Sequence, residues 1–203
     1  MSALAQLIFV LNEFVWFIIF AIVIGFSVKR QGFKYSTVFF LPAVVWGLLL
    51  EYATQEVFNR YHYGGGFLVY VANVPLNISL AWAALIFIAY WYITQKVHLK
   101  NSIAIAVSAA VPLLLLDFFV LEPTARLFGF WTWTPQSVWF GSPIGNVYGW
   151  FWVIVLYLSF YHFLSGKTTD WRKALLLNLG LILLRIAILI AFLQVWKVTF
   201  GGL

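Results

Sequence analysis

Residues 4–28 read LAQLIFVLNEFVWFIIFAIVIGFSV, an apolar run in which Glu13 is the one charged residue. A helix needs about 20 apolar residues to cross the roughly 30 Å of hydrocarbon in a bilayer. The run is longer than the apolar core of a signal peptide, and it has no basic residue before it and no clear small-residue cleavage site. We therefore expect a retained first transmembrane helix.

The composition of the whole chain extends this expectation. The 203 residues are 64% hydrophobic and only 9% charged, whereas soluble domains carry about 25% charged residues. The predicted fold class is all-α, a polytopic transmembrane helical bundle of about six spans that forms a single integral membrane domain over residues 1–203. The predicted spans are 4–28, 37–57, 67–94, 101–121, 145–164 and 174–198. Pro75 is expected to kink or break the third span.

The basic residues indicate the orientation of the bundle. Most of them fall in the loops after the first, third and fifth predicted spans: Lys29, Arg30, Lys34, Lys96, Lys100, Lys167, Arg172 and Lys173. The other side carries Arg60, Arg126 and Lys197. The positive-inside rule then predicts a multi-pass protein of the cell membrane with both termini outside the cytoplasm. The net charge of +6 reflects this topology, so no nucleic-acid partner is expected.

An aromatic-rich loop or re-entrant segment is predicted at residues 122–145. It combines three prolines with six large aromatic residues: Phe128, Phe130, Trp131, Trp133, Trp139 and Phe140. One interpretation is an interfacial belt, where aromatic rings lie at the level of the lipid headgroups. The alternative is a lid or cavity wall that faces a long apolar ligand from the bilayer.

Ionisable residues inside the spans are candidates for a functional site, because each costs about 2.5–3.5 kcal/mol on insertion scales. They are Glu13, Glu51, Asp117 and Arg185, with Glu122 just beyond the fourth span. Glu51 and Asp117 both lie late in spans that run outward, so we expect them at similar depth. Desolvation and mutual repulsion would keep one of two such carboxyl groups neutral, which is the arrangement used in general acid–base catalysis. In the alternative interpretation Arg185 forms a buried ion pair with one of them.

Other chemistries find little support in the sequence. The chain has no cysteine, and its three histidines have no second ligand at metal-binding spacing. The run Gly64-Gly65-Gly66 lacks the Lys and Ser/Thr of a phosphate-binding loop. No catalytic triad is evident either. We expect no metal and no cofactor.

Three blocks of sequence within residues 50–152 resemble those of a known family. They are Glu51 with Phe67-Leu68-Val69-Tyr70, Val74-Pro75-Leu76-Asn77-Ile78 and Ala81-Trp82; Asp117 with Glu122-Pro123 and Trp131-Thr132-Trp133; and Gly141-Ser142-Pro143 with Asn146 and Tyr148-Gly149-Trp150. In this order they resemble the integral-membrane carotenoid biosynthesis proteins that include the bisanhydrobacterioruberin and myxol-type carotenoid hydratases. The chain departs from the family pattern at Asn73, where glycine is usual, and at Ser142, where valine is usual.

The resemblance implies a hydro-lyase that adds water to the terminal double bond of an acyclic carotenoid end group and forms a tertiary alcohol. Asp117 is the expected proton donor and Glu51 the expected water partner, although the two roles can be exchanged, and Glu122 completes the catalytic set. Indole rings would stabilise the intermediate cation. The expected substrate-binding residues are Tyr70, Asn77, Trp82, Trp131, Trp133, Asn146, Tyr148, Trp150 and Arg185.

Three other functions use the same residues. A membrane carotenoid cyclase or isomerase would also protonate an alkene, but would then lose a proton instead of adding water. A non-catalytic carotenoid- or quinone-binding subunit would use the aromatic segment to grip its ligand. A proton-coupled transporter also needs intramembrane carboxylates. The expected partners are the lipid bilayer, an acyclic carotenoid or other polyisoprenoid, and either further carotenoid-pathway enzymes or a second copy of the chain.

Overall fold

Six apolar segments form helices in the computed structural model, which describes residues 2–134 and 142–200. They are α1 (Ala3–Gln31); α2 (Phe33–Tyr52); α3 (Leu76–Tyr92); α4 (Ser102–Leu116), which continues into α5 (Glu122–Phe128); α6 (Ile144–Ser165); and α7 (Trp171–Gly180), followed by α8 (Ile182–Phe200). Each of the six is long and apolar enough to cross a membrane. The prediction of an all-α polytopic bundle is confirmed.

Three of these spans contain a turn of π-helix. The turns are η1 (Ala53–Val57) at the end of α2, η2 (Ile93–Val97) at the end of α3, and η3 (Asp117–Leu121) between α4 and α5. Such turns replace the usual i→i+4 hydrogen bonds with i→i+5 bonds and occur frequently at functional sites. Two of the three adjoin the carboxylates Glu51 and Asp117.

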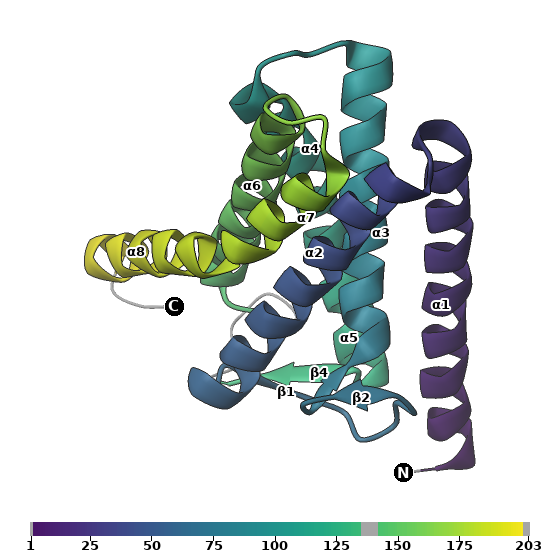
Figure 1. Ribbon diagram of the computed structural model, residues 1–203. Coiled ribbons are helices and arrows are strands. Elements are labelled where there is room, and N and C mark those ends of the chain that lie inside the picture. Colours follow the sequence, from purple (N-terminus) through teal and green to yellow (C-terminus); the bar gives the residue numbers. More distant parts are fainter. Residues whose placement is uncertain (1, 135–141, 201–203) are drawn as a thin grey trace.

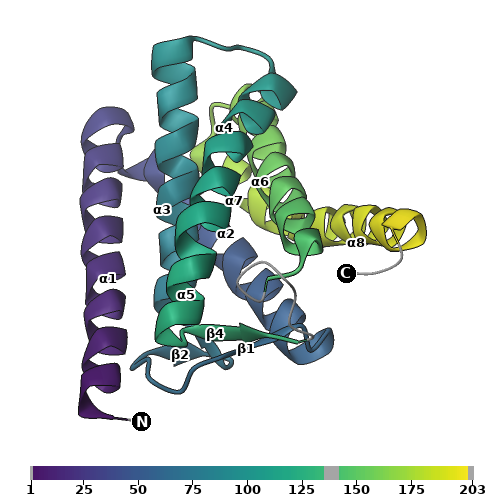
Figure 2. The same cartoon turned by 180° about the vertical axis from the view of Figure 1, so that it is seen from behind.

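The helices pack closely where their side chains are small. Helix α4 lies against α6 and α3, while α1 and α2 both contact α3 (Figures 1 and 2). Ala106, Ala109 and Ala110 of α4 are fully buried, as is Ala84 of α3. Small residues let helix backbones approach within a membrane, where the hydrophobic effect does not drive association. In contrast, α1 exposes most of its apolar residues, as expected for a helix that faces lipid.

Four short strands close one end of the bundle, called the strand end below. Strand β1 (Tyr61–Tyr63) pairs antiparallel with β4 (Trp131–Trp133), and β2 (Tyr70–Val71) pairs with β3 (Val74–Pro75). Figures 1 and 2 show this end beside the N-terminus. The opposite end carries the loops with the eight basic residues named above.

The predicted third span, 67–94, starts before the helix α3, which begins at Leu76. Residues 70–75 form the β2–β3 hairpin, whose turn residues Ala72 and Asn73 both have positive φ, as a two-residue hairpin of this kind requires. Pro75 lacks a backbone N–H and stands as the N-cap of α3, so the helix begins at Leu76. The expected interruption at Pro75 is therefore the start of the helix.

The aromatic segment combines a helix and a strand. Its first seven residues, Glu122–Phe128, extend the fourth span as α5, and Trp131–Trp133 then form β4. Trp139 and Phe140 lie outside the described residues. The sixth span was predicted to be continuous, but α7 ends at Gly180 and α8 begins at Ile182. Figure 1 shows α8 running across the direction of α1 and α3.

Glu13 and Phe9 attach α1 to the strand end. The Glu13 carboxylate accepts hydrogen bonds from the backbone N–H groups of Leu68 (2.7 Å) and Val69 (2.9 Å), so the buried Glu13 side chain holds a loop against α1. The Phe9 ring packs on Gly66, where a Cβ would lie 2.4 Å from Cγ of that ring. The glycine run thus provides a close approach between the loop and α1, and not only a turn.

Candidate functional site

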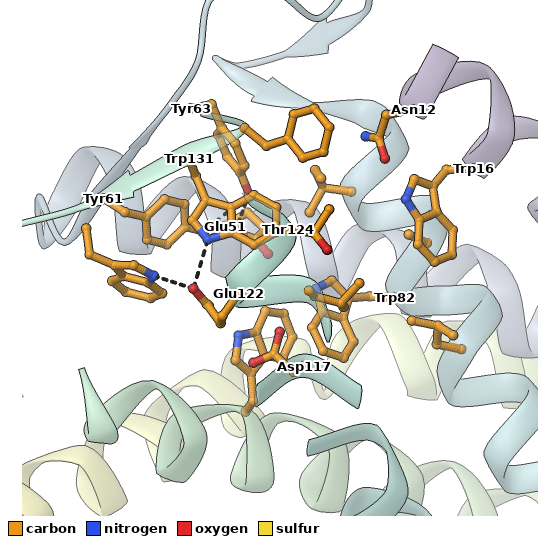
Figure 3. Close-up of a pocket in the computed structure, with 17 residues that line it drawn as sticks. Asn12, Trp16, Glu51, Tyr61, Tyr63, Trp82, Asp117, Glu122, Thr124 and Trp131 are labelled. Carbon is orange, nitrogen blue, oxygen red and sulfur yellow. Dashed lines mark hydrogen bonds between the residues drawn. The ribbon is translucent and has the colours of Figure 1, made fainter. Parts of the chain in front are cut away.

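A cavity lies at the strand end of the bundle, and three carboxylates line it. Glu51 comes from the end of α2, Asp117 from the start of η3 and Glu122 from the start of α5 (Figure 3). Each of the three side chains is 3% exposed. The rest of the wall is largely aromatic and includes Trp16, Trp82, Trp131, Trp133 and Trp150. The site is therefore a largely aromatic chamber with three acidic groups in its wall.

The η3 turn explains why Asp117 and Glu122 share this chamber. Residues five apart on an α-helix point about 140° away from each other. Here the Glu122 N–H bonds to the Asp117 carbonyl, an i→i+5 bond that makes the five-residue spacing one complete turn. Both side chains consequently face the same cavity.

Glu122 is held by three N–H donors. Its Oε2 accepts from Trp131 Nε1 (3.2 Å) and Trp133 Nε1 (2.8 Å), and its Oε1 accepts from Asn146 Nδ2 (2.9 Å). Donors aimed at a carboxylate stabilise its ionised form. Alternation along β4 places Trp131 and Trp133 on the cavity side and leaves Thr132 between them exposed.

Glu51 receives a tyrosine hydroxyl from the neighbouring strand. Tyr63 Oη donates to Glu51 Oε2 at 2.6 Å, and Tyr61 Oη lies 3.3 Å from Tyr63 Oη. Burial, reinforced by the Glu51 carboxyl group, raises the pKa of Tyr63 well above its ordinary value, so its hydroxyl remains a donor. The paired strands thus direct two hydroxyls and two indole N–H groups to one face.

Among the described residues, the hydrogen bond to Asp117 is the longest of those to the three carboxyl groups. Asn146 Nδ2 donates this bond to Asp117 Oδ2 at 3.4 Å. Asn146 also donates to Glu122, so this amide lies between the two carboxyl groups. The three acidic groups therefore occupy distinct environments.

Two tryptophans form a stacked wall of the cavity. The rings of Trp82 and Trp150 lie 3.9 Å apart between centroids with an interplanar angle of 19°. A second cavity shares Glu51, Tyr61, Trp133 and Trp150 with the first and extends to Leu189 and Leu193 of α8. The two cavities therefore adjoin each other at Trp150.

Four of the expected substrate-binding residues lie elsewhere in the described structure. Tyr148 donates to the Phe192 carbonyl (3.2 Å), Asn77 is fully buried, and Tyr70 lines a separate pocket at the strand end. Neither these three residues nor Arg185 belongs to the described wall of the carboxylate cavity. Trp82, Trp131, Trp133 and Trp150 do line this cavity, and Asn146 reaches two of its carboxylates.

Arg185 does not form the ion pair considered from the sequence. Its guanidinium donates to the Asn178 carbonyl (3.2 Å) and to the Asn178 side chain, and it lies 5.3 Å from the ring centroids of Tyr157 and Phe160. These contacts bridge the break between α7 and α8. Arg185 therefore holds two helices together, away from the carboxylates.

Tyr61 and Tyr63 are the site residues that sequence reasoning missed. The segment was interpreted as part of a connection between spans, yet Tyr61-His62-Tyr63 has the same alternation as Trp131-Thr132-Trp133, which was recognised. That shared alternation was the available signal for a strand pair. Among the described residues no group of three His, Asp or Glu side chains is arranged to hold a metal ion.

Comparison with known proteins identifies the family. A family model described as carotenoid biosynthesis protein matches residues 8–202, nearly the entire chain. No curated protein and no solved structure matches it. The chain therefore belongs to the carotenoid biosynthesis protein family, as a multi-pass membrane protein with a role in carotenoid biosynthesis.

Proposed function

We propose that the protein is a carotenoid hydratase that adds water to the terminal double bond of an acyclic carotenoid end group by acid catalysis. The observation that carries the proposal is one apolar cavity in which three buried carboxyl groups differ in their hydrogen bonding. Hydration of an alkene needs an acid, a base for the attacking water and a wall that tolerates a cation.

Asp117 is the proton donor in this mechanism. With one long hydrogen bond and a hydrogen-bonded Glu122 carboxylate nearby, it has the least support for a negative charge. Its proton adds to the less substituted alkene carbon, which leaves a tertiary cation and the Asp117 carboxylate. Glu122, whose three N–H donors favour its carboxylate form, offsets the developing positive charge in this proposal.

Glu51 is the water partner. The water oxygen bonds to the tertiary carbon and one of its protons passes to the Glu51 carboxylate, while Tyr63 holds that carboxylate in place. Return of this proton to Asp117 restores the starting state. The net change is addition of one water, without oxidant or reductant.

The indole rings supply the remaining stabilisation. A desolvated cation over an aromatic face gains about 2 kcal/mol, and the stacked pair Trp82 and Trp150 presents such a face in the cavity wall. An apolar wall also suits a hydrocarbon end group. In this proposal the polyene chain extends toward the adjoining cavity that leads to α8.

Pigment analysis of a host that accumulates acyclic carotenoids tests this function. Expression of the wild-type chain is expected to give products heavier by one water per modified end group, and Asp117→Asn is expected to abolish them. Chromatography with mass spectrometry provides the measurement. Products of unchanged mass would instead indicate cyclisation or isomerisation, and unmodified pigment that copurifies with the chain would indicate a binding subunit.

A further inference from the structure

A polar pocket at the strand end lies next to the carboxylate cavity, and Tyr63 belongs to the walls of both. The pocket is lined by Gln55, Glu56, His62, Tyr70 and Asn73 in addition to Tyr63 and Gly65. Glu56, His62 and Asn73 are exposed. Tyr63 thus borders both an open polar pocket and the carboxylate cavity.

Gln55 in this pocket has a buried acceptor that no described residue satisfies. The side chain is 7% exposed, and its Nε2 donates to Glu56 Oε1 (3.0 Å) and to the Asn73 carbonyl (3.2 Å). These two acceptors fix the orientation of the amide, and Oε1 then has no hydrogen-bond partner. A buried carbonyl oxygen without a donor is costly, and a water molecule is the smallest group that satisfies it.

The position of Gln55 relates this oxygen to the proposed chemistry. Gln55 follows Glu51 by four residues, about one turn, where α2 passes into η1. The Glu51 carboxylate accepts from Tyr63, which lines both pockets. Tyr63 therefore links the polar pocket that contains Gln55 to the carboxylate of Glu51.

We propose that this pocket is the port through which water reaches Glu51, with Gln55 Oε1 as the acceptor that holds the water. The port rests on the proposed hydration and identifies the route of its second substrate. Water delivered here bonds through its oxygen to the tertiary carbon and gives one proton to Glu51. The carotenoid enters from the apolar side, so the two substrates approach by separate routes.

A variant with an impaired port is expected to form the cation as before. Only the later fate of the cation should change. When water delivery is impaired, the cation returns a proton and re-forms an alkene. In D2O each such return leaves deuterium in unhydrated carotenoid. Gln55→Met, which keeps the length of the side chain and removes its oxygen, is expected to lower hydrated product about tenfold, the effect of one lost hydrogen bond, while deuterium incorporation persists or rises.

The measurement uses membranes that contain the full chain, an acyclic carotenoid and D2O, with mass spectrometry of hydrated and unhydrated pigment. A matched control exists in η2, because Thr54-Gln55-Glu56-Val57 has a counterpart in Thr94-Gln95-Lys96-Val97 at the opposite end. Gln95 is exposed, and Gln95→Met is expected to leave both readouts unchanged.

Each other outcome decides against the port. An equal fall in hydration and deuterium incorporation would assign Gln55 to the proton step or to folding, and no change in either would remove it from the reaction. If Gln55→Met does not accumulate in membranes, Gln55→Leu, which also removes the oxygen, is measured in its place with the same expected result. Absence of hydrated product from the wild type would overturn the proposed function and the port with it.

Discussion

The Glu122 carboxylate accepts hydrogen bonds from three N–H donors, one on Asn146 and two on the indoles of β4. A carboxylate accepts all three of these bonds, whereas an amide in its place must turn an NH2 group toward at least one N–H donor. This fixed set of donors is what distinguishes Glu122 from Asp117 in the same cavity. Individual hydrogen bonds thus give these two buried carboxyl groups different environments.

Glu122→Gln is expected to destabilise the protein by about 1–3 kcal/mol, because one buried donor loses its acceptor. Thermal unfolding of the detergent-solubilised protein measures the change. Glu56→Gln is the control, since Glu56 is exposed at the strand end. Equal stability of the two variants would contradict the hydrogen-bond assignment.

Trp150 is expected to act through its ring face. Trp150→Leu removes the stacked partner of Trp82 and should lower the rate of hydration by about tenfold to thirtyfold, the value of one desolvated cation–π contact. Trp150→Phe should retain part of the rate. Trp152, which stacks on Phe192 outside both cavities, provides the matched control Trp152→Phe. Similar losses at Trp150 and Trp152 would indicate packing alone.

At the scale of the secondary-structure elements, the irregular turns carry the site. The π turn η3 makes a five-residue spacing equal to one turn, and the β1–β4 pair converts alternation along two strands into four inward polar groups. The break between α7 and α8 is likewise held by a specific contact, Arg185 on Asn178. Helix regularity is interrupted where function or chain direction requires it.

Changes of length within η3 should have unequal effects. Deletion of Val120 converts the turn to α-helix with Asp117 and Glu122 four residues apart, which keeps both on one face. Insertion of alanine after Phe119 rotates Glu122 by about 100°. We expect the deletion variant to retain measurable hydration and the insertion variant to have none, with comparable amounts in the membrane. The reverse order would show that the π turn does not set this alignment.

The α7–α8 break should show coupling between its two partners. Asn178→Leu is expected to cost about 1.5–3 kcal/mol, because a buried guanidinium loses a charged hydrogen bond. The double variant Asn178→Leu with Arg185→Leu should be less destabilised than the sum of the single variants, since it also removes the cation. Thermal unfolding of all four proteins provides the cycle, and additive effects would argue against a direct interaction.

At the scale of the whole molecule, the basic loops and the proposed active site lie at opposite ends of the bundle. The basic loops after α1, α3 and α6 lie at one end, and the strands, the carboxylate cavity and the polar pocket lie at the other (Figure 1). The positive-inside rule predicts that the basic end is cytoplasmic. The site would then open in the outer half of the bilayer.

Cysteine labelling tests this orientation directly, because the chain has no cysteine of its own. His62→Cys at the strand end is expected to react with a membrane-impermeant maleimide in intact spheroplasts. Lys100→Cys at the basic end should react only after permeabilisation. Labelling of Lys100→Cys alone in intact spheroplasts would invert the topology.

The apolar spans, the intramembrane carboxylates and the aromatic segment after the fourth span could all be predicted from the sequence. Each depends on local composition set against the thickness and low polarity of a bilayer. The start of α3 at Leu76, the break at Leu181 and the helical extension at Glu122 could not. Local patterns determine that a segment is apolar enough to span the membrane. They do not determine the residue at which contacts with neighbouring backbone groups end the helix.

The composition of the site depended on tertiary structure. Glu122 faces Asp117 because η3 adds one residue to a turn, Tyr63 reaches Glu51 because β1 pairs with β4, and Arg185 lies away from both carboxylates because it binds at a helix break. Each of these arrangements depends on hydrogen bonds. The positions of the groups that form these bonds are set by the folding and packing of the chain. The residue types therefore indicated acid–base chemistry in a membrane, and only the folded chain determined which acidic groups meet and which hydrogen bonds each one receives.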